Sequence, residues 1–476
     1  MKKYVASSSD AGQFYLCFHK TAFKNSSLKK KQKMTNNLHV LTINEFIDSQ
    51  DPNLDKEIVT LIDQYSGELV NFRKQAKPVP ANGRYLYRTK INNDESIVYY
   101  KRIVTQDISI KIAEVYGDGN TDDSPEIQQL IDEMETGQVL RLDNKRYMLR
   151  SPLQINKAIK IKGSSVKSNI SFPPFLITNN NDGIILNTSG VVLEGFGIYN
   201  IIWHTTSPNT FTGIKVNGIV ENHINDIILR DLTIRGYHTA LEVNHMCSSQ
   251  IQTLKTENCK VGIHVKGLSA HNAISGNTSI MINHHYDIPG SRGIWFEGSF
   301  PKEGWRITHT NICNVYEGIY AEKASQINVN HSIIDFCRHT GITIAEGCNN
   351  WNINSNYIAL SQPGYGIFLA NNAQPSALSR GNKIVDNDLF IYEHAENDTT
   401  SIGINIIGEG SFYDEVRGNS LKNFKAYDIK TDTGLKTTII HNKCLSEITP
   451  NIMGNFLAND NLGTVCYQKA ANQPLS

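Results

Sequence analysis

The chain has 476 residues, with 46 basic and 46 acidic side chains, so its formal net charge at pH 7 is zero when histidine is neutral. This balance gives no field that would favour a nucleic acid or an anionic membrane, and no stretch approaches the ~18 apolar residues of a membrane span. Aromatic residues make up 9% of the chain and glycines number 34, which favours a β-rich protein with many turns over a helical bundle.

Eight cysteines are spread along the chain without a C-x-x-C pair and without a Cys/His set at zinc-like spacing. Most of them lie among apolar residues, as is typical of small buried hydrophobic side chains. The sequence therefore predicts no disulfide framework, no metal site and no cofactor.

The first 34 residues begin with a basic segment, and their apolar run FYLCFHK is too short and too interrupted for a signal peptide. The lysine-rich stretch KNSSLKKKQK has two interpretations, a nucleic-acid or membrane patch and a disordered leader ahead of a translation start at Met34. We interpret residues 1–34 as the leader, and we expect neither a nucleic-acid partner nor a membrane span.

A helical pattern covers residues 38–75, and the stretches RYLYRTKI and SIVYYKRIV after it alternate apolar and polar residues as a β-hairpin does. The apolar residues at i, i+3, i+4 and i+7 spacing are Ile58, Leu61, Ile62 and Tyr65. We therefore expect residues 35–110 to form a small α+β adaptor or neck domain.

A short helix is predicted after the turn signal at Asp118-Gly119. Ser124 is a good N-cap and Pro125 suits the first helical position. The buried stripe of this helix would be Ile127, Leu130, Ile131 and Met134. Strands are then expected at QVLRLD, YMLR and AIKIKG.

Beyond residue 180 the chain repeats a short strand that begins with Gly-Ile or a close variant, mostly at steps of 22 to 27 residues. The strands are GIKVN at Gly213, ALEVN at Ala240, GIHVK at Gly262, GIWFE at Gly293, GIYAE at Gly318, GITIA at Gly341, GIFLA at Gly366 and GINII at Gly403. A period in the low twenties with one fixed turn residue predicts a parallel β-solenoid over residues 111–447, followed by a tail at 448–476. A second pattern places Asn356, Asn387, Asn419 and Asn442 at one position of successive coils and predicts a hydrogen-bonded asparagine ladder.

Successive side chains of a strand point to opposite faces, so the two faces of the repeated strand can be assigned. The positions one and three after the glycine are apolar in every coil and should point into the core. The positions two and four after it should point outward. The first outward column is Lys215, Glu242, His264, Trp295, Tyr320, Thr343, Phe368 and Asn405, and the second is Asn217, Asn244, Lys266, Glu297, Glu322, Ala345, Ala370 and Ile407.

A row of outward aromatic residues is unfavourable unless something covers it. Sugar rings stack on aromatic side chains and pair their hydroxyls with carboxylates, amides and basic groups. We therefore interpret the outward columns as a glycan-binding groove along the helix axis; the alternative is that a loop, the N-terminal domain or a neighbouring subunit covers the aromatic rings. The substrate-binding candidates are Trp295, Tyr320, His264, Lys266, Phe368 and Asn244.

The motif YGDGNTDDSPEIQ, from Tyr116 to Gln128, followed by stacked GI and N-x-I coils, resembles the pectate-lyase-like right-handed β-helix superfamily, which includes phage tailspikes and capsule depolymerases. The resemblance covers about residues 110–447. It implies an all-β, right-handed parallel β-helix whose N-terminal cap is built by this motif, so that Asp118, Asp122 and Asp123 have a structural role.

Two glutamates, Glu297 and Glu322, occupy one outward column in adjacent coils. Strands lie about 4.7–4.9 Å apart, and a pair of carboxyl groups about 5–5.5 Å apart fits retaining glycoside hydrolysis. The competing interpretation is a solvated charge ladder in which Lys266 compensates the glutamates. Further catalytic candidates are Glu242 on the same face and Asp335 in IIDFCRHTG. A lyase would instead use His264, Lys266 or Tyr320 as base.

Together these features predict a tailspike-like depolymerase that binds and cleaves a bacterial surface polysaccharide, with glycoside hydrolysis by paired carboxylates. The alternatives are a polysaccharide lyase or epimerase of cellular origin and a non-catalytic glycan-binding β-helix. The resemblance further implies a homotrimer, attachment to a virion baseplate or tail through the N-terminal domain, and a place in the virion tail or outside the cell. Because residues 448–476 contain no evident trimerisation domain, oligomeric mass would separate the tailspike from the other two hypotheses.

Overall fold

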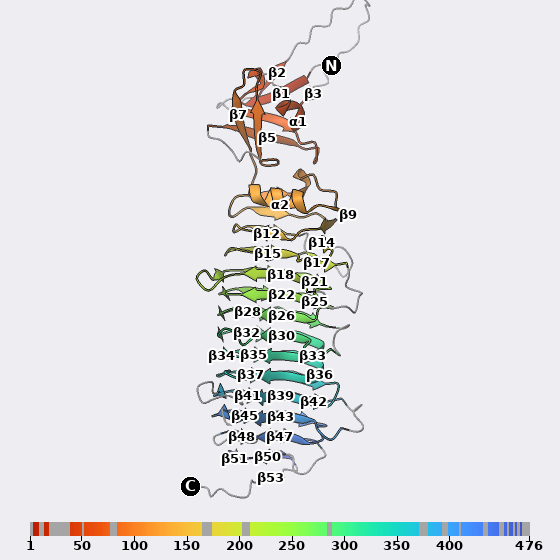
Figure 1. Cartoon of the computed structure of the whole chain (residues 1–476), viewed down its shortest axis with the longest axis vertical. Helices are drawn as coiled ribbons and strands as arrows, with labels where there is room; N and C mark the ends of the chain where they lie inside the picture. The colour runs from red at the N-terminus through yellow and green to blue at the C-terminus, as the bar shows by residue number, and fades with distance from the viewer. Residues whose placement is uncertain are drawn as a thin grey trace, which may run out of the picture. The chain divides into compact units, whose positions relative to one another are not determined.

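The computed structural model describes residues 3–8, 14–18, 39–49, 52–76, 83–163, 174–201, 210–282, 288–370, 379–392, 398–408, 411–431, 437–446, 452–454, 457–459, 462–463 and 467–468. It divides into two compact units (Figure 1). The N-terminal unit comprises Met1–Tyr116 and Asp123–Asp143, and the β-helix unit comprises Gly117–Asp122 and Asn144–Ser476. No helix in the described part of the chain is long and apolar enough to cross a membrane.

The N-terminal unit is built on a largely antiparallel sheet with the strand order β2-β1-β4-β5-β7-β6, in which β3 also pairs with β1. Its strands are β1 Lys3–Ser8, β2 Phe14–Phe18, β3 His39–Val40, β4 Ile58–Ile62, β5 Leu69–Gln75, β6 Tyr87–Ile91 and β7 Ile97–Arg102. The helix α1 (Ile43–Ile47) starts at a capping box between Thr42 and Glu45 and packs Phe46 into the core beside Tyr100. The predicted hairpin is confirmed, because β6 and β7 pair antiparallel from Tyr87↔Lys101 to Ile91↔Ile97.

The long helix predicted within residues 38–75 is wrong beyond α1. Three of the residues at helical spacing lie in strand β4, in which Val59 and Leu61 are buried and alternate with partly exposed neighbours. The fourth, Tyr65, lies in the turn that follows. A short apolar run such as IVTLI fits both a helical period and an alternating one, and pairing with β5 on one side and β1 on the other decides for the strand. Strands β1 and β2 likewise lie inside the segment predicted to be a disordered leader; residues 19–34 of that segment lie outside the described residues.

The predicted short helix is present as α2 (Ser124–Glu133), with Ile127, Leu130, Ile131 and Met134 buried as expected. Its N-cap is Asp123, one residue before the predicted cap, and Asp123 accepts a hydrogen bond from the backbone of Tyr116. In the same unit β8 (Asp107–Ser109) pairs in parallel with β10 (Val139–Arg141), and the short 3-10 helices η1 and η2 cover Pro52–Leu54 and Ile110–Ile112. Asp118 accepts hydrogen bonds from Asn120 and Thr121, which agrees with a structural role for this motif.

The β-helix unit is a right-handed parallel β-helix, as the repeat predicts, and Figure 1 shows its strands stacked coil upon coil. Each complete coil contributes one strand to each of three parallel ladders. The first ladder contains β13 Lys160–Lys162, β16 Val192–Glu194, β20 Ile228–Arg230, β24 Gln250–Gln252, β28 Ala273–Ser275, β32 Arg306–Thr308, β35 Asn328–Asn330, β37 Asn352–Asn354, β41 Lys383–Val385, β45 Glu415–Arg417, β48 Thr438–Ile440 and β51 Leu457–Asn459.

The second and third ladders share the long strands β33 (Asn311–Ala321) and β36 (Ile333–Ile344), which run from one into the other. The second ladder also contains β9 Asp118–Asp122, β11 Arg146–Leu149, β14 Phe175–Thr178, β17 Gly197–Asn200, β21 Thr233–Arg235, β25 Lys255–Glu257, β29 Ser279–Met281, β38 Tyr357–Leu360, β42 Asp388–Ile391, β46 Ser420–Lys422, β49 Lys443–Cys444 and β52 Leu462–Gly463. The third ladder, formed by the Gly-Ile strands and their neighbours, also contains β12 Leu153–Ile155, β15 Ile184–Leu186, β18 Thr212–Asn217, β22 Thr239–Asn244, β26 Val261–Val265, β30 Arg292–Phe296, β39 Tyr365–Ala370, β43 Ile402–Ile407, β47 Tyr427–Thr431, β50 Ile452–Gly454 and β53 Tyr467–Gln468.

Short strands extend the corners of several coils. They are β19 Ile224–Asn225, β23 Met246–Cys247, β27 Ser269–Ala270, β31 Lys302–Glu303 and β34 Ala324–Ser325 in one row, and β40 Ser379–Arg380 with β44 Ser411–Phe412 in another. Strands β50 to β53 lie within the segment predicted to be a tail after residue 447 and continue the ladders, so the stacking extends further than the repeat in the sequence indicated.

The repeated glycine is required by the close approach of neighbouring coils. A Cβ added at Gly293 would lie 2.6 Å from the carbonyl oxygen of Gly318, and one added at Gly318 would lie 2.4 Å from that of Gly341. Real Cβ atoms do not approach carbonyl oxygens this closely, so any larger residue would push the coils apart. Glycine is therefore a steric requirement at Gly293 and Gly318, while Ala240 and Asp428 occupy the same position in two other coils.

The predicted asparagine ladder is confirmed. The side-chain amide of Asn387 donates to Oδ1 of Asn419 and to the carbonyl of Ile353, while its Oδ1 accepts from the backbone and side chain of Asn356. Asn419 repeats this pattern with Asn442, and all these side chains are buried. The ladder satisfies polar backbone groups at a corner that no regular strand covers.

Candidate functional site on the third ladder

The third ladder aligns the predicted outward columns in register. His264 pairs with Trp295, Trp295 with Tyr320, Tyr320 with Thr343, and Thr343 with Phe368. The inward positions Ile294, Phe296, Ile319 and Ala321 are fully buried. The predicted core face is therefore correct, whereas four members of the predicted outer column are themselves buried: Glu242, His264, Thr343 and Asn405.

The aromatic side chains of the outer face stack on their protein neighbours and do not form a row of open platforms. The imidazole of His264 lies parallel to the ring of Trp295 with 3.9 Å between the ring centres. The guanidinium of Arg292 lies 4.5 Å from the centre of the Trp295 ring and 3.7 Å from that of Tyr320. We call His264, Trp295, Arg292 and Tyr320 the ring stack. Its members lie against one another's ring faces, and sugar binding at Trp295 stays a prediction.

Glu297 and Glu322 follow the paired strands β30 and β33 in adjacent coils, and each carboxylate is held by its own donors. Oε2 of Glu297 lies 2.9 Å from Nε2 of His264. Oε1 of Glu322 accepts a 2.7 Å hydrogen bond from the hydroxyl of Tyr320, and its Oε2 accepts from the backbone of Gly298 at 3.1 Å. The Glu297 side chain is 36% exposed, so this carboxylate remains accessible from outside the coil.

The ring stack also fixes the protonation states of its polar members. Burial, with the charge of Lys266 adding to it, lowers the pKa of His264 to about 3, so the imidazole is neutral at ordinary pH. A neutral imidazole can donate one hydrogen bond, and the contact assigns it from Nε2 to Glu297. Burial and the hydrogen bond to Glu322 raise the pKa of Tyr320, so its hydroxyl stays a donor.

Glu242, two coils before Glu297, is the centre of a separate ion-pair cluster. Its carboxylate lies 2.9 Å from Nζ of Lys266 and 3.6 Å from Nζ of Lys215, and it accepts from the amide of Asn244 at 3.1 Å. Burial works against ionisation, but the hydrogen bond and charge of Lys266 lower the pKa of Glu242. Lys266 thus pairs with Glu242, and the charge ladder of Lys266 with Glu297 and Glu322 that the sequence also suggested is not the arrangement found.

Two residues that the sequence did not single out complete the site. Nε of Arg292 lies 2.7 Å from Oε2 of Glu317, and Oε1 of Glu317 lies 4.0 Å from Nδ1 of His339. The His339 ring stacks on Tyr316 with 5.1 Å between ring centres. Arg292 and Glu317 directly precede the repeated glycine of adjacent coils and pair in register, so an Arg/Glu match at that position was the signal available in the sequence.

Lys302 in β31 is a fully buried amine close to the two candidate glutamates. Its Nζ donates to the backbone carbonyls of Glu297 and of Phe300, the latter at 2.6 Å. Burial lowers the pKa of Lys302 to about 8, and the charges of Glu297, Cys348 and Glu322 partly oppose the shift. The two hydrogen bonds from Lys302 hold the backbone from Glu297 to Phe300 in place and so restrict the position of the Glu297 carboxylate.

The remaining predicted residues lie away from this cluster. Phe368 lies two coils beyond Tyr320 and stacks on Tyr365 with 4.6 Å between ring centres. Asp335 lies in the part of β36 that belongs to the second ladder, where its Oδ1 accepts a 3.0 Å hydrogen bond from the hydroxyl of Tyr392. The structure therefore brings His264, Trp295, Tyr320, Glu297 and Glu322 together and places Asp335 with a different aromatic group.

No protein-family model and no curated protein matches the sequence. Among solved structures, the chain is similar to the enzymatically active domain of tailspike protein 2 from bacteriophage CBA120, at 13% identity and a TM-score of 0.57 over 80% of this chain and 57% of that one. Full-length tailspike protein 2 from an Escherichia coli O157:H7 bacteriophage is similar at 14% identity and a TM-score of 0.56, over 79% of this chain and 50% of that one.

A third similar structure is DFA-IIIase from Arthrobacter chlorophenolicus A6 without its lid, at 14% identity and a TM-score of 0.51, over 75% of this chain and 94% of that one. The chain spans about half the length of the two tailspike chains it matches. At such identities the likeness concerns the fold. The chain has a tailspike-like parallel β-helix fold.

Proposed function

We propose that this protein is a polysaccharide depolymerase of the phage tailspike type within the pectate-lyase-like superfamily. It binds a bacterial surface glycan, a capsule or an O-antigen, along the outer face of the third ladder and cleaves it by glycoside hydrolysis. The observation that carries the proposal is the pair Glu297 and Glu322, which follow hydrogen-bonded strands in adjacent coils and are each oriented by a donor from the ring stack.

The hydrogen bonds support different roles for the two carboxyl groups. Glu322 is fixed by Tyr320 and Gly298 and suits the nucleophile, which attacks the anomeric carbon to form a glycosyl ester. Glu297, whose side chain is 36% exposed, suits the acid, which protonates the leaving glycosidic oxygen. Glu297 then accepts a proton from the water that attacks the anomeric carbon and releases Glu322. The strand spacing of about 4.7–4.9 Å is compatible with the roughly 5–5.5 Å of retaining enzymes.

The substrate would contact the edges of the ring stack and the polar groups beside it. Lys266 and Asn244 extend this surface toward earlier coils, and Phe368 extends it toward later ones. The tailspike-like fold supports the further proposals that the active protein is a homotrimer, that its N-terminal unit attaches to a virion baseplate or tail, and that it acts outside the host cell.

One observation favours a second candidate, a non-catalytic glycan-binding β-helix. Both glutamates already have protein donors within hydrogen-bond distance, as residues of a structural network do. A lyase or epimerase of cellular origin is less well supported, because His264 lies buried against Trp295 and donates its available hydrogen to Glu297. The experiment below separates these candidates.

The protein is first spotted on lawns of a panel of encapsulated bacteria, and a halo identifies a strain whose glycan is degraded. The purified glycan is then digested while reducing ends and the absorbance of unsaturated uronates are measured. Hydrolysis gives new reducing ends without that absorbance, and a lyase gives both. Binding of the glycan without either product supports the binding module.

The variants Glu297→Gln and Glu322→Gln should each lower the cleavage rate by about 10³-fold or more while glycan binding is retained. Glu303→Gln is the matched control, because Glu303 is exposed on the neighbouring strand β31. Full activity in both glutamine variants would show that this pair does not carry the reaction.

A further inference from the structure

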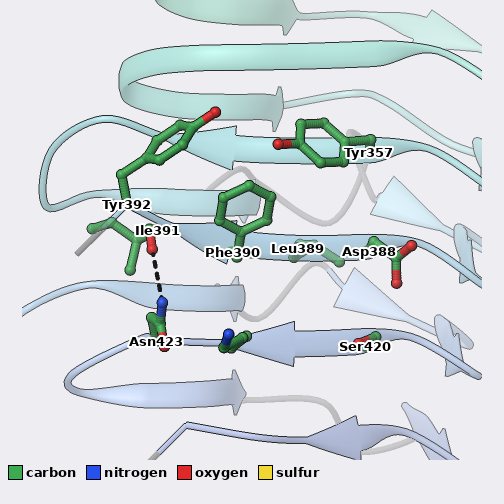
Figure 2. Close-up of a pocket in the computed structure, with 9 residues that line it drawn as sticks. Tyr357, Asp388, Leu389, Phe390, Ile391, Tyr392, Ser420 and Asn423 are labelled. Carbon is green, nitrogen blue, oxygen red and sulfur yellow. Dashed lines mark hydrogen bonds between the residues drawn. The ribbon is translucent and has the colours of Figure 1, made fainter.

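A second aromatic group lies on the second ladder, apart from the ring stack. A hollow of about 520 Å³ is lined by residues of β38, β42 and β46, with Tyr357, Phe390 and Tyr392 as its aromatic members. Figure 2 shows the hydroxyls of Tyr357 and Tyr392 directed toward each other, with the ring of Phe390 beside them. This volume lies in the range of small-molecule sites.

The rings around the hollow are arranged differently from those of the ring stack. Phe390 contacts Tyr357 and Tyr392 edgewise, at interplanar angles of 76° and 74° with ring centres 5.0 and 5.1 Å apart. Neither tyrosine is stacked face to face on Phe390, and Leu389 and Ile391, its neighbours in the strand, point into the core. Phe390 itself is only partly buried. An apolar ring surface is thus presented to the hollow.

Charged groups of opposite sign flank this ring. Lys422 pairs in register with Phe390, and Asp388 lies two residues before it on the same face of β42. Both side chains are exposed, and neither has a hydrogen bond or an ion pair with any residue that the structure describes. Lys422 can therefore donate a hydrogen bond, and Asp388 can accept one, beside the ring of Phe390.

Two residues of β36, Asp335 and Phe336, contact the side chain of Tyr392. Its hydroxyl donates to Oδ1 of Asp335 at 3.0 Å, and the exposed ring of Phe336 lies 5.4 Å from its own ring. Phe336 has a φ of 56°, a left-handed conformation that is costly for a bulky side chain. Asn314, at the same corner of the preceding coil, also has a φ of 56°, so the left-handed conformation belongs to this corner of the coil.

We propose that this hollow binds one neutral pyranose ring, as a glycan subsite separate from the third ladder. A C–H face of the sugar packs on Phe390, and its hydroxyls donate to Asp388 and accept from Lys422. A sugar hydroxyl can both donate and accept hydrogen bonds. Because Asp388 and Lys422 carry opposite charges, they favour a ligand without net charge. The proposal rests on the proposed function only in taking a glycan as the ligand, since no step of the cleavage reaction involves the hollow.

The test places 4-fluorophenylalanine at position 390, a nearly isosteric change, and follows its ¹⁹F resonance while glucose, galactose, mannose or N-acetylglucosamine is added to the full chain. At least one of these neutral pyranoses should give a saturable shift in the millimolar range. The same label at position 368 is the matched reporter on the third ladder. The absence of a saturable shift at position 390, or an equal shift with glycerol, would overturn the proposal.

Substitutions at the rim identify the ligand chemistry. Asp388→Asn and Lys422→Gln should each raise the dissociation constant about tenfold, whereas Lys383→Gln on the first ladder should leave it unchanged. A response confined to glucuronate or glucosamine would disprove the neutral class. Because Glu297→Gln should keep the response at position 390, failure of this site and failure of the cleavage proposal give different results.

Discussion

At the scale of single residues, Arg292 links the aromatic and acidic parts of the site. Its guanidinium lies between the rings of Trp295 and Tyr320 and makes a 2.7 Å ion pair with Glu317. The Glu317 side chain is only 11% exposed, so its charge depends on this partner. One side chain thus holds together the surface that the proposed substrate would contact.

Replacing Arg292 with alanine should lower the free energy of unfolding by about 3 kcal/mol, because it removes the stacking and leaves the Glu317 carboxylate buried without its partner. Denaturant unfolding followed by circular dichroism measures the loss. Arg306→Ala in the next strand of the first ladder is the control, and should change the stability by no more than about 0.5 kcal/mol because Arg306 is exposed. Equal effects of the two substitutions would contradict this role.

At the scale of elements, the asparagine ladder satisfies buried polar groups at one corner of the stack. Asn387 accepts from two donors of Asn356 and donates to Asn419 and Ile353, all within the core. Removing such a side chain leaves several buried backbone and amide groups without partners.

The variant Asn387→Ala should therefore cost about 3 kcal/mol of unfolding free energy. Asn311→Ala, at an exposed position of β33, supplies the comparison and should be nearly neutral. Guanidinium titrations of both variants measure the difference. A loss below about 1 kcal/mol for Asn387→Ala would mean that water can replace the ladder.

Another ladder of buried polar side chains runs from Asn382 to Asp414 and ends in a carboxyl group whose pKa is raised. Oδ1 of Asp414 accepts from the backbone and side chain of Asn382, while its Oδ2 is buried with no hydrogen-bond partner among the described residues. Burial raises the pKa of Asp414 from 3.8 to about 7. The folded state therefore binds this proton more tightly than the unfolded state, so the stability contribution is complete below pH 3.8 and is lost as the pH rises through 7.

Replacing Asp414 with asparagine, the residue used throughout the neighbouring ladder, removes the buried charge. At pH 8 the Asp414→Asn variant should be more stable than the parent by about 2–4 kcal/mol, and the gain should shrink toward pH 4. Unfolding free energies measured across this range check the sign. A gain that does not change with pH would exclude Asp414 as its source.

The sequence predicts the fold well where one residue type recurs at one position. The glycine column and Asn356, Asn387, Asn419 and Asn442 are periodic because each coil imposes the same local geometry on the next. The candidate pair Glu297 and Glu322 could be found for the same reason. Strand β4 was missed because a short apolar run fits two periods, and its partners come from distant segments.

The repeat in the sequence does not predict how the side chains stack. The register places Trp295 beside His264 and Tyr320, but it does not reveal that Arg292 turns across both aromatic rings. The hollow was hidden for a related reason, since Tyr357, Phe390 and Lys422 come from three coils of the second ladder, which carries no conspicuous sequence pattern. Rotamers and contacts between coils decide both features.

At the scale of the whole molecule, the molecular mass in solution tests the proposed homotrimer. The chain has a mass of 53.3 kDa, so light scattering on the purified protein should give three times this value. Exposed apolar side chains of the β-helix unit, such as Ile219 and Val220, are available for a contact between copies. A mass of one chain at micromolar concentration would count against the trimer and leave the fold and the site unaffected.

The glycine column has a consequence for how such a molecule can change its length over generations. Each glycine meets the carbonyl of its counterpart in the next coil in nearly the same way, whether the pair is Gly293 with Gly318 or Gly341 with Gly366. Coils that carry this glycine therefore share one contact geometry, whereas Ala240 and Asp428 occupy the position in two other coils. The length of the β-helix should therefore change in steps of one whole coil. The length of the β-helix is thus set by the number of coils that the sequence encodes.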